Sequence, residues 1–175
     1  KYAFISDYVR LDAVYEYGGI YLDIDVELIK PLDDLLKYKC FLGTEEFGRV
    51  ATGLCFGAVP RHWFIKENKK YYEEKNFIVN NRLKLEICAD VTTTLLKKYG
   101  LSNSSNNQKI KDIVIFTPDY FCPKNYTTNK LKITKNTYSI HHFASTWKSK
   151  YKIIRDIKYL QMRVIIILKK FLNIL

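Results

Sequence analysis

At 175 residues, the chain has the length of a single domain, and its 47% hydrophobic and 15% aromatic content fits a globular protein with a sizeable core. No apolar run is long enough to span a bilayer. The net charge of +11 is uneven: residues 148–175 hold eight basic residues and one acid, a net +7, which leaves +4 for the other 147 residues. Because the charge lies on an apolar-rich tail and not on an aromatic-interleaved surface, the composition argues against a nucleic-acid-binding protein.

The cysteines and the first residue bear on where the protein acts. Four widely spaced cysteines include no Cys-x-x-Cys pair, so reduced thiols in a cytoplasmic protein are the simplest interpretation. The chain begins without an initiator methionine, inside a predicted helix. We therefore expect it to be a fragment that lacks a preceding segment.

The first predicted element is a helix over Lys1–Tyr17, which Gly18 is placed to end. Asp7 and Arg10 are three residues apart and therefore neighbours on the helix surface. Two consecutive glycines then turn the chain directly into the next element. This turn is expected to bring the Asp7 and Arg10 face of the helix close to that element.

The second predicted element is a strand over Ile20–Leu28, in which apolar and polar residues alternate strictly. The apolar residues are expected to face the core, and Asp23, Asp25 and Glu27 the other side. Carboxylates this close repel one another unless they are solvated or hold a cation, and Asp23 and Asp25 can share one hard divalent ion. An arginine beside such an ion is what a phosphate or sugar-phosphate site requires.

Residues 6–10 (Ser-Asp-Tyr-Val-Arg) and 17–25 (Tyr-Gly-Gly-Ile-Tyr-Leu-Asp-Ile-Asp) closely resemble the signature of the DXD sugar transferases of glycosyltransferase family 32, which includes bacterial capsule and polysaccharide enzymes. The resemblance runs from residue 1 to about residue 31 and returns at residues 140–148. It implies an α/β fold of the GT-A type, a mixed sheet flanked by helices, here without its N-terminal part.

Further elements are predicted from hydrophobic runs and turn residues: strands at 40–43, 51–59, 113–116 and 137–143, helices at 63–75 and 83–99, and a polar loop at 102–108. In the strand at 51–59, Thr52 and Gly53 would let the backbone approach a ligand closely, although glycines that only relieve packing explain the pattern equally well. The resemblance places this strand beside the donor sugar, which makes Thr52 a donor-binding candidate.

The segment His141–Lys148 is the second cluster of chemically active residues. Adjacent strand residues point to opposite faces, so only one of the two histidines can readily reach a given metal. By the resemblance, His142 takes a metal-ligand position, Ser145 supplies a hydroxyl to the donor, and Trp147 caps the diphosphate through its indole N–H. The alternative for His142 is a core histidine bonded to backbone.

Residues 151–175 are predicted to form a basic, partly amphipathic helix beyond a catalytic domain at 1–150. Such a helix suits the surface of an anionic membrane, and the expected location is cytoplasmic or peripheral on the inner face of the cell membrane. The alternative is that this helix packs against the missing N-terminal part.

These features predict an enzyme: a Mn²⁺- or Mg²⁺-dependent glycosyltransferase that moves a sugar from a nucleotide-sugar donor to a saccharide or lipid-linked acceptor in polysaccharide biosynthesis. Asp25 and His142 would bind the metal, and Asp23 would hold donor hydroxyls or reach the metal through water. Asp7, Arg10 and Tyr21 would line the donor pocket. The resemblance also implies that the anomeric configuration is retained.

Two other functions remain as alternatives. A phosphatase of the haloacid dehalogenase type also carries Asp-X-Asp after a hydrophobic strand, but its usual Thr or Val is replaced here by Glu27, and no later Lys and paired-Asp motif stands out. A non-catalytic sugar-binding protein would be expected to lose the metal-binding set. This chain keeps both aspartates, the arginine and Trp147.

Overall fold

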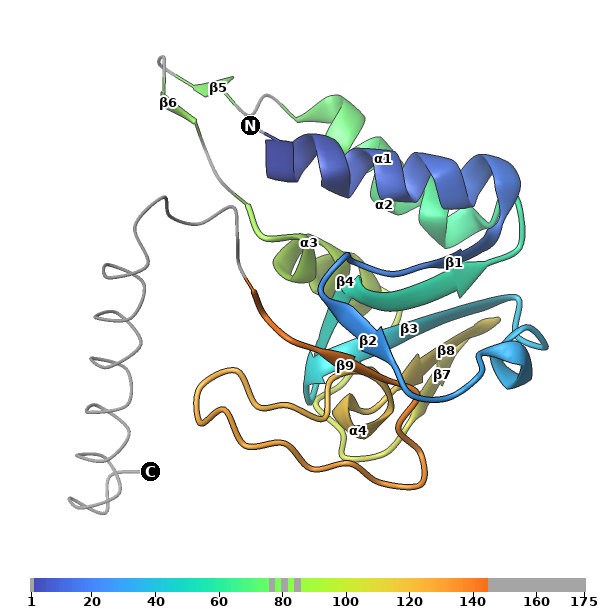
Figure 1. Ribbon diagram of the computed structural model, residues 1–175. Helices are drawn as coiled ribbons and strands as arrows, with labels where there is room; N and C mark the ends of the chain where they lie inside the picture. Colours follow the sequence, from blue (N-terminus) through green and yellow to red (C-terminus); the bar gives the residue numbers. More distant parts are fainter. Residues whose placement is uncertain (1, 76–77, 80–81, 84–85, 145–175) are drawn as a thin grey trace.

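The computed structural model describes residues 2–75, 78–79, 82–83 and 86–144 (Figure 1). Its helices are α1 (Tyr2–Tyr17), α2 (Trp63–Glu74), α3 (Cys88–Lys97) and α4 (Pro118–Phe121), with a 3₁₀ turn η1 (Asp33–Leu35). Its strands are β1 (Gly19–Tyr21), β2 (Val26–Leu28), β3 (Cys40–Glu46), β4 (Arg49–Ala58), β5 (Ile78–Val79), β6 (Arg82–Leu83), β7 (Gln108–Ile110), β8 (Ile113–Phe116) and β9 (Ser139–His141).

The main sheet has five strands in the order β1-β4-β3-β8-β7. The pair β3–β8 is parallel and the other neighbours are antiparallel, so the sheet is mixed. Strands β2 and β9 form a separate antiparallel pair, and β5 and β6 form a third. Helices α1 and α2 lie side by side at one end of the molecule, and α3 packs on β4 (Figure 1). The predicted α/β class with a mixed sheet flanked by helices is confirmed.

The core is divided into two clusters by the sheet. One joins α1, α2 and α3 to the strands and includes Leu11, Phe56 and Ile65. The other is rich in aromatic residues and includes Phe41, Phe116 and Phe121, whose rings meet at centroid separations of 5.6–6.3 Å. Burying both faces of β3 and β8 agrees with their continuous apolar sequences.

The end of α1 follows the sequence prediction. The amide of Gly18 donates to the carbonyl of Val14 at 2.9 Å, and Gly18 and Gly19 both adopt positive φ, at 69° and 95°. A side chain at position 18 would also collide with the ring of Pro60, 2.7 Å from an added Cβ. Glycine is therefore required for the sharp turn that leads α1 into β1.

The predicted continuous strand at 20–28 is wrong. The chain leaves the main sheet after Tyr21, makes a turn in which the amide of Val26 donates to the carbonyl of Asp23 at 3.1 Å, and then enters the separate pair β2–β9. Ile24, expected in the core, is 99% exposed at the tip of this turn. Leu28, also expected in the core, is 50% exposed, so the strict alternation in the sequence does not describe the burial of these two short strands.

Two other expectations change. The helix predicted at 83–99 begins only at Cys88, and residues 82–83 pair with 78–79 as a short hairpin. The polar loop at 102–108 ends one residue early, because Gln108 starts β7.

The C-terminal helix predicted at 151–175 and the boundary at residue 150 lie outside the described residues. Among the residues described, no helix is both long and apolar enough to cross a membrane.

The packing face of α1 gives a stability prediction. Leu11 is 1% exposed and belongs to the core, whereas Ile5 on the same helix is 51% exposed. Leu11→Ala should lower the free energy of unfolding by about 2–5 kcal/mol, because it leaves a cavity, while Ile5→Ala should change it by less than about 0.5 kcal/mol. Urea unfolding of the two variants measures both values. Equal losses would contradict the orientation of α1 described here.

Candidate donor and metal site

The candidate site is formed by three consecutive segments of the chain and by β9, which is distant from them in sequence. Helix α1 contributes Asp7 and Arg10, β1 contributes Tyr21, the turn after β1 contributes Asp23 and Asp25, and the end of β9 contributes a histidine. The glycine turn at the end of α1 is what brings the first two parts together. The predicted grouping of the helix face with the Asp-X-Asp segment is therefore seen in the structure.

Arg10 is the centre of the site. Its Nη2 lies 2.8 Å from Oδ1 of Asp7, and its Nη1 lies 3.3 Å from Oδ1 of Asp23. The guanidinium also lies over the ring of Tyr21, 5.0 Å from the centroid. Arg10 is only 6% exposed. A charge this buried needs partners, and the two carboxylates and the ring supply them.

Asp23 is held from two sides by protein groups. The Tyr21 hydroxyl donates to Oδ1 of Asp23 at 2.8 Å, the same oxygen that faces Arg10. Burial raises the pKa of Tyr21, an effect that Arg10 opposes and Asp23 reinforces, so the phenol keeps its proton for this bond. The orientation of the Asp23 carboxylate is therefore set before any ligand binds.

Asp7 is the most strongly shifted carboxylate of the site. Burial raises its pKa to about 6, against the lowering effect of Arg10 and with a further contribution from the negative charge of Asp23. For Arg10 itself, burial would lower the pKa, but Asp7 and Asp23 outweigh it and raise the pKa above its usual value. Arg10 therefore stays charged while Asp7 titrates near neutrality.

Asp25 connects the turn to β9. Its Oδ2 accepts a hydrogen bond from the amide of Ala144 at 2.8 Å, and its carbonyl accepts one from the amide of His142 at 3.0 Å. Its Oδ1 lies 3.4 Å from Nε2 of His141. Burial lowers the pKa of His141, although Asp25 and Asp23 oppose this shift, which favours a neutral imidazole that can act as a ligand.

In the structure His141, and not the predicted His142, lies beside the two aspartates. Nε2 of His142 lies 2.8 Å from Oε2 of Glu27, and the side chains whose ligand atoms lie within 4.8 Å of one another are Asp23, Asp25 and His141. The prediction chose His142 from its spacing to Trp147 in the family resemblance, and it allowed only one of the two histidines to reach a given metal. The turn before Val26 separates Asp25 from Glu27, and the register that pairs Val26 with His141 brings His141 to Asp25. Only this register, which the sequence does not reveal, could have indicated His141.

Strand β4 passes directly beneath the site at Gly53. A Cβ added there would lie 2.6 Å from Oδ2 of Asp23 and 3.0 Å from Nη1 of Arg10. Between the pairs Leu42↔Phe56 and Gly43↔Ala51, residues 52–55 have no partner on β3 and form a bulge. Bulges of this kind redirect side chains next to binding sites. Thr52, the predicted donor contact, is 1% exposed within this bulge, next to Gly53.

Ser145 and Trp147, the predicted hydroxyl and indole contacts to the donor, lie outside the described residues.

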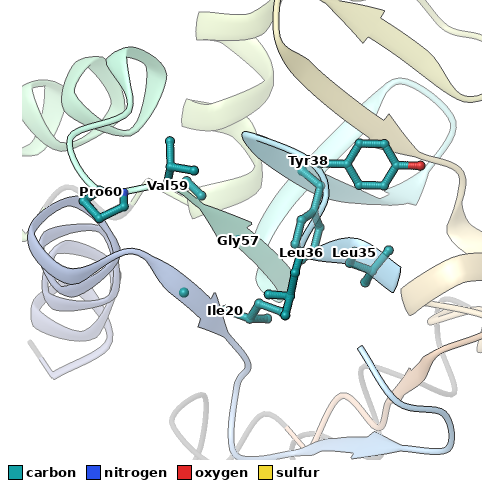
Figure 2. Close-up of a pocket in the computed structure, with 10 residues that line it drawn as sticks. Ile20, Leu35, Leu36, Tyr38, Gly57, Val59 and Pro60 are labelled. Carbon is teal, nitrogen blue, oxygen red and sulfur yellow. The ribbon is translucent and has the colours of Figure 1, made fainter. Parts of the chain in front are cut away.

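A separate apolar pocket lies between β1, η1 and the end of β4 (Figure 2). It is lined by Gly19, Ile20, Leu35, Leu36, Tyr38, Phe41 and residues 57–60. Because none of these side chains is charged, this pocket is not where a diphosphate would bind.

The donor groups present fit a divalent metal ion. One ligand atom from each of Asp23, Asp25 and His141 lies within 4.8 Å of the other two, and Nδ1 of His141 is buried without a hydrogen-bond partner among the described residues. Two carboxylates and one imidazole suit a first-row transition ion such as Mn²⁺ better than Mg²⁺, which prefers oxygen ligands. The set fits Mn²⁺.

The family match covers Asp7, Arg10, Tyr21, Asp23 and Asp25 but not His141. Residues 1–42 match the family described as "glycosyltransferase sugar-binding region containing DXD motif". Relatives include Glucan organizing enzyme 1 of Cryptococcus neoformans, 52% identical over 44 residues (25% of this chain, 12% of that protein). Inositol phosphoceramide mannosyltransferase 1 of Schizosaccharomyces pombe is 38% identical over 61 residues (34% and 18%). Mannosyl phosphorylinositol ceramide synthase CSH1 of Saccharomyces cerevisiae is 37% identical over 76 residues (42% and 20%).

Residues 1–42 therefore match the DXD sugar-binding region of glycosyltransferases, and the predicted resemblance is confirmed for this part of the chain. The matched stretches cover 12–20% of the length of these relatives. The relatives named here are fungal proteins, so the predicted bacterial capsule origin has no support among them. No solved structure matches the chain.

The raised pKa of Asp7 gives a pH-dependence prediction. Because the folded state holds the Asp7 proton up to about pH 6 and the unfolded state releases it near pH 4, stability contributed by Asp7 is present below pH 4 and lost as pH rises to 6. The unfolding free energy of the wild type, relative to Asp7→Asn, should fall by about 2 kcal/mol over this range. Urea unfolding at several pH values, with chelator present, measures it. A flat difference would contradict the burial of Asp7.

Proposed function

We propose that the protein is a metal-dependent glycosyltransferase that binds a nucleotide-sugar donor at the Asp7–Arg10–Asp23–Asp25–His141 cluster. The observation that carries this proposal is the cluster itself: a buried arginine and two metal-binding carboxylates within one matched sugar-binding region. A sugar diphosphate is negatively charged, and the cluster offers it both a place for a metal cation and the positive charge of an arginine.

Asp25, Asp23 and His141 would hold the ion, with Asp25 and His141 positioned by the β2–β9 pair. When bound, the ion neutralises charge that develops on the diphosphate as the sugar–phosphate bond breaks. His141 is thus proposed as the third ligand in place of His142, which the sequence analysis had named. His142 instead bonds to Glu27 and would act, at most, on the orientation of β2.

The remaining residues of the site bind and orient the donor. Arg10 is already committed to Asp7 and Asp23, so its role is to fix the Asp23 carboxylate and to add positive potential near the diphosphate. The carboxylate of Asp7, with its pKa near 6, is suited to hydrogen bonds with sugar hydroxyls. Gly53 keeps the floor of the site open, and any side chain there would displace Asp23.

The phosphatase alternative fits this geometry less well. In that chemistry the first aspartate of the motif is the nucleophile and must reach the phosphorus atom. Here the corresponding residue, Asp23, is fixed by Tyr21 and faces Arg10 through the same oxygen. An arrangement that restrains this carboxylate favours a binding or ligand role over a nucleophilic one.

The names of two relatives refine the choice of substrates. Both are named for mannosyl transfer to inositol phosphoceramide, so mannose is the first sugar to test and a lipid carrying a phosphorylated inositol the first acceptor class. This lipid class replaces capsule saccharides as the first acceptor to test. The GT-A type of fold is part of the same proposal and is supported by the family match and the mixed sheet. Retention of the anomeric configuration is proposed with it, on the family resemblance alone.

Metal binding can be tested with a pair of adjacent histidines. His141→Ala should weaken Mn²⁺ binding by at least about tenfold, because it removes a ligand, while His142→Ala should leave it nearly unchanged. Calorimetric titration of Mn²⁺ into both variants and into Asp25→Ala gives the affinities. A larger loss in His142→Ala than in His141→Ala would contradict the site described here.

Catalysis can be tested by donor hydrolysis across a panel of nucleotide sugars, with Mn²⁺ and with chelator, using the full-length protein. Turnover of one donor with Mn²⁺ is expected, and Asp23→Ala and Asp25→Ala should lower it by about 100-fold or more, as losses of a transition-state charge contact do. Asp33→Ala in η1, an exposed aspartate outside the site, is the control. If no donor turns over but phosphate esters are hydrolysed, the transferase proposal fails and the phosphatase alternative gains support.

A further inference from the structure

The segment between α4 and β9 has a composition unlike the rest of the described chain. Residues 122–137 contain Lys124, Lys130, Lys132 and Lys135 and no acidic residue. From Lys130 to Lys135, lysines alternate with Leu131 and Ile133. We call residues 124–135 the basic loop. Figure 1 shows it projecting beyond the sheet, at the end of the molecule opposite α1 and α2.

The basic loop is built by its own hydrogen bonds. The Asn125 side chain accepts bonds from the amides of Thr127 and Thr128, at 3.0 and 2.7 Å. Backbone bonds join the amide of Asn125 to the carbonyl of Lys130 at 2.9 Å, and the amide of Lys132 to the carbonyl of Pro123 at 3.0 Å. The conformation is therefore specified, and its surface is a defined feature of the fold.

Two large aliphatic side chains of this loop remain partly in water. Leu131 is 50% exposed and Ile133 is 54% exposed, so about half of each side chain stays in water. The same fold buries many smaller apolar residues almost completely, including Ala51 and Ala89. Two large aliphatic residues held in water by an ordered loop, between lysines, mark a surface that contacts something else.

The charge on this surface is larger than the loop alone provides. Lys30, from the segment after β2, donates to the carbonyl of Lys135 at 3.2 Å and adds its ammonium to the same region. The nearest acid in sequence, Asp119, is engaged internally by the hydroxyl of Thr117 at 2.6 Å and the amide of Asn136 at 2.9 Å. The basic loop and the neighbouring Lys30 therefore supply five lysines to a region that also exposes two aliphatic side chains.

The basic loop also lies next to the candidate site. The ring of Tyr126 contacts that of Phe143, with centroids 5.1 Å apart, and Phe143 in turn contacts the ring of His141, at 4.3 Å. A surface bound by the loop would thus lie close to the proposed metal-binding histidine, since Phe143 contacts both Tyr126 and His141.

We propose that the basic loop is a docking surface for an anionic lipid bilayer. The five lysines would lie at the level of the anionic headgroups, and Leu131 and Ile133 would enter the boundary between headgroups and acyl chains. This surface is distinct from residues 151–175, to which membrane contact was assigned from the sequence.

The alternation of charge and aliphatic groups favours a bilayer over other anionic partners. Single-stranded nucleic acid is bound by aromatic side chains on which bases stack, whereas the two most exposed large side chains of this loop, Leu131 and Ile133, are aliphatic and the ring of Tyr126 packs against Phe143. Aliphatic side chains beside lysines gain free energy when a lipid interface accepts both at once. If the proposed function holds, the same contact places a lipid-linked acceptor beside the site.

The test compares two triple variants of the full-length chain that lose the same charge. One is Lys130→Gln/Lys132→Gln/Lys135→Gln in the basic loop. The other is Lys66→Gln/Lys70→Gln/Lys97→Gln, at exposed lysines of α2 and α3. Both keep residues 145–175, so any contact made there is common to both. Binding to phosphatidylcholine vesicles with and without 30% phosphatidylserine (roughly a cytoplasmic-leaflet charge) is measured by co-sedimentation.

Each lysine at an anionic surface strengthens binding about fivefold, so the loop variant should bind the anionic vesicles at least about tenfold more weakly than the wild type. The control variant should change by less than about threefold. Both triple variants should bind poorly to neutral vesicles. Equal losses in the two triple variants, or no binding of the wild type to anionic vesicles, would overturn the proposal.

A second measurement locates the contact. The Trp emission of Leu131→Trp, after subtraction of the wild-type signal, should shift to shorter wavelength with anionic vesicles and be quenched by brominated lipid. Phe47→Trp, at an exposed position in the β3–β4 turn, should do neither. No shift at position 131, or loss of nucleic-acid binding in the loop variant while vesicle binding is intact, would also overturn it.

These measurements need neither donor nor metal, so they succeed or fail independently of the transferase proposal. If both proposals hold, the loop variant should keep wild-type hydrolysis of a soluble donor and lose transfer to an acceptor lipid in vesicles.

Discussion

The structure of the site depends on one buried charge. Arg10 is almost fully removed from water, and Asp7 and Asp23 provide the partners that make its burial tolerable. This requirement ties helix α1 to the turn after β1, with Gly18 supplying the sharp connection between them. The same burial explains the raised pKa of Asp7: desolvation disfavours its charged form more than Arg10 favours it, and the negative charge of Asp23 adds to the rise.

A second constraint is the pair β2–β9. Because β2 leaves the main sheet, it can pair with a strand that arrives more than 110 residues later and bring the end of the domain over the aspartates. The amides of His142 and Ala144 donate to Asp25 at this junction, and the imidazole of His141 joins it. The Asp-X-Asp segment is thus in a turn between two sheets, where its carboxylates converge on one point.

The same junction links the site to the molecular surface. Phe143 contacts both His141 and Tyr126, so the proposed metal ligand and the basic loop share one aromatic contact. The hydrogen bonds that Asp119 accepts hold the base of the loop against α4. An enzyme whose acceptor is lipid-linked would benefit from a membrane contact this close to the reacting groups, since the acceptor headgroup would then arrive already oriented.

The sequence by itself determined the α/β class, helix α1 with its glycine stop, most strands of the main sheet, and the grouping of Asp7 and Arg10 with Asp23 and Asp25. Those features follow from local periodicity, turn chemistry and a nearly continuous motif, which act over a few residues. The break in the predicted strand and the position of His141 beside Asp25 depend on the tertiary structure. A one-residue change in facing depends on a strand register set by distant partners, and alternation along a single chain cannot encode it.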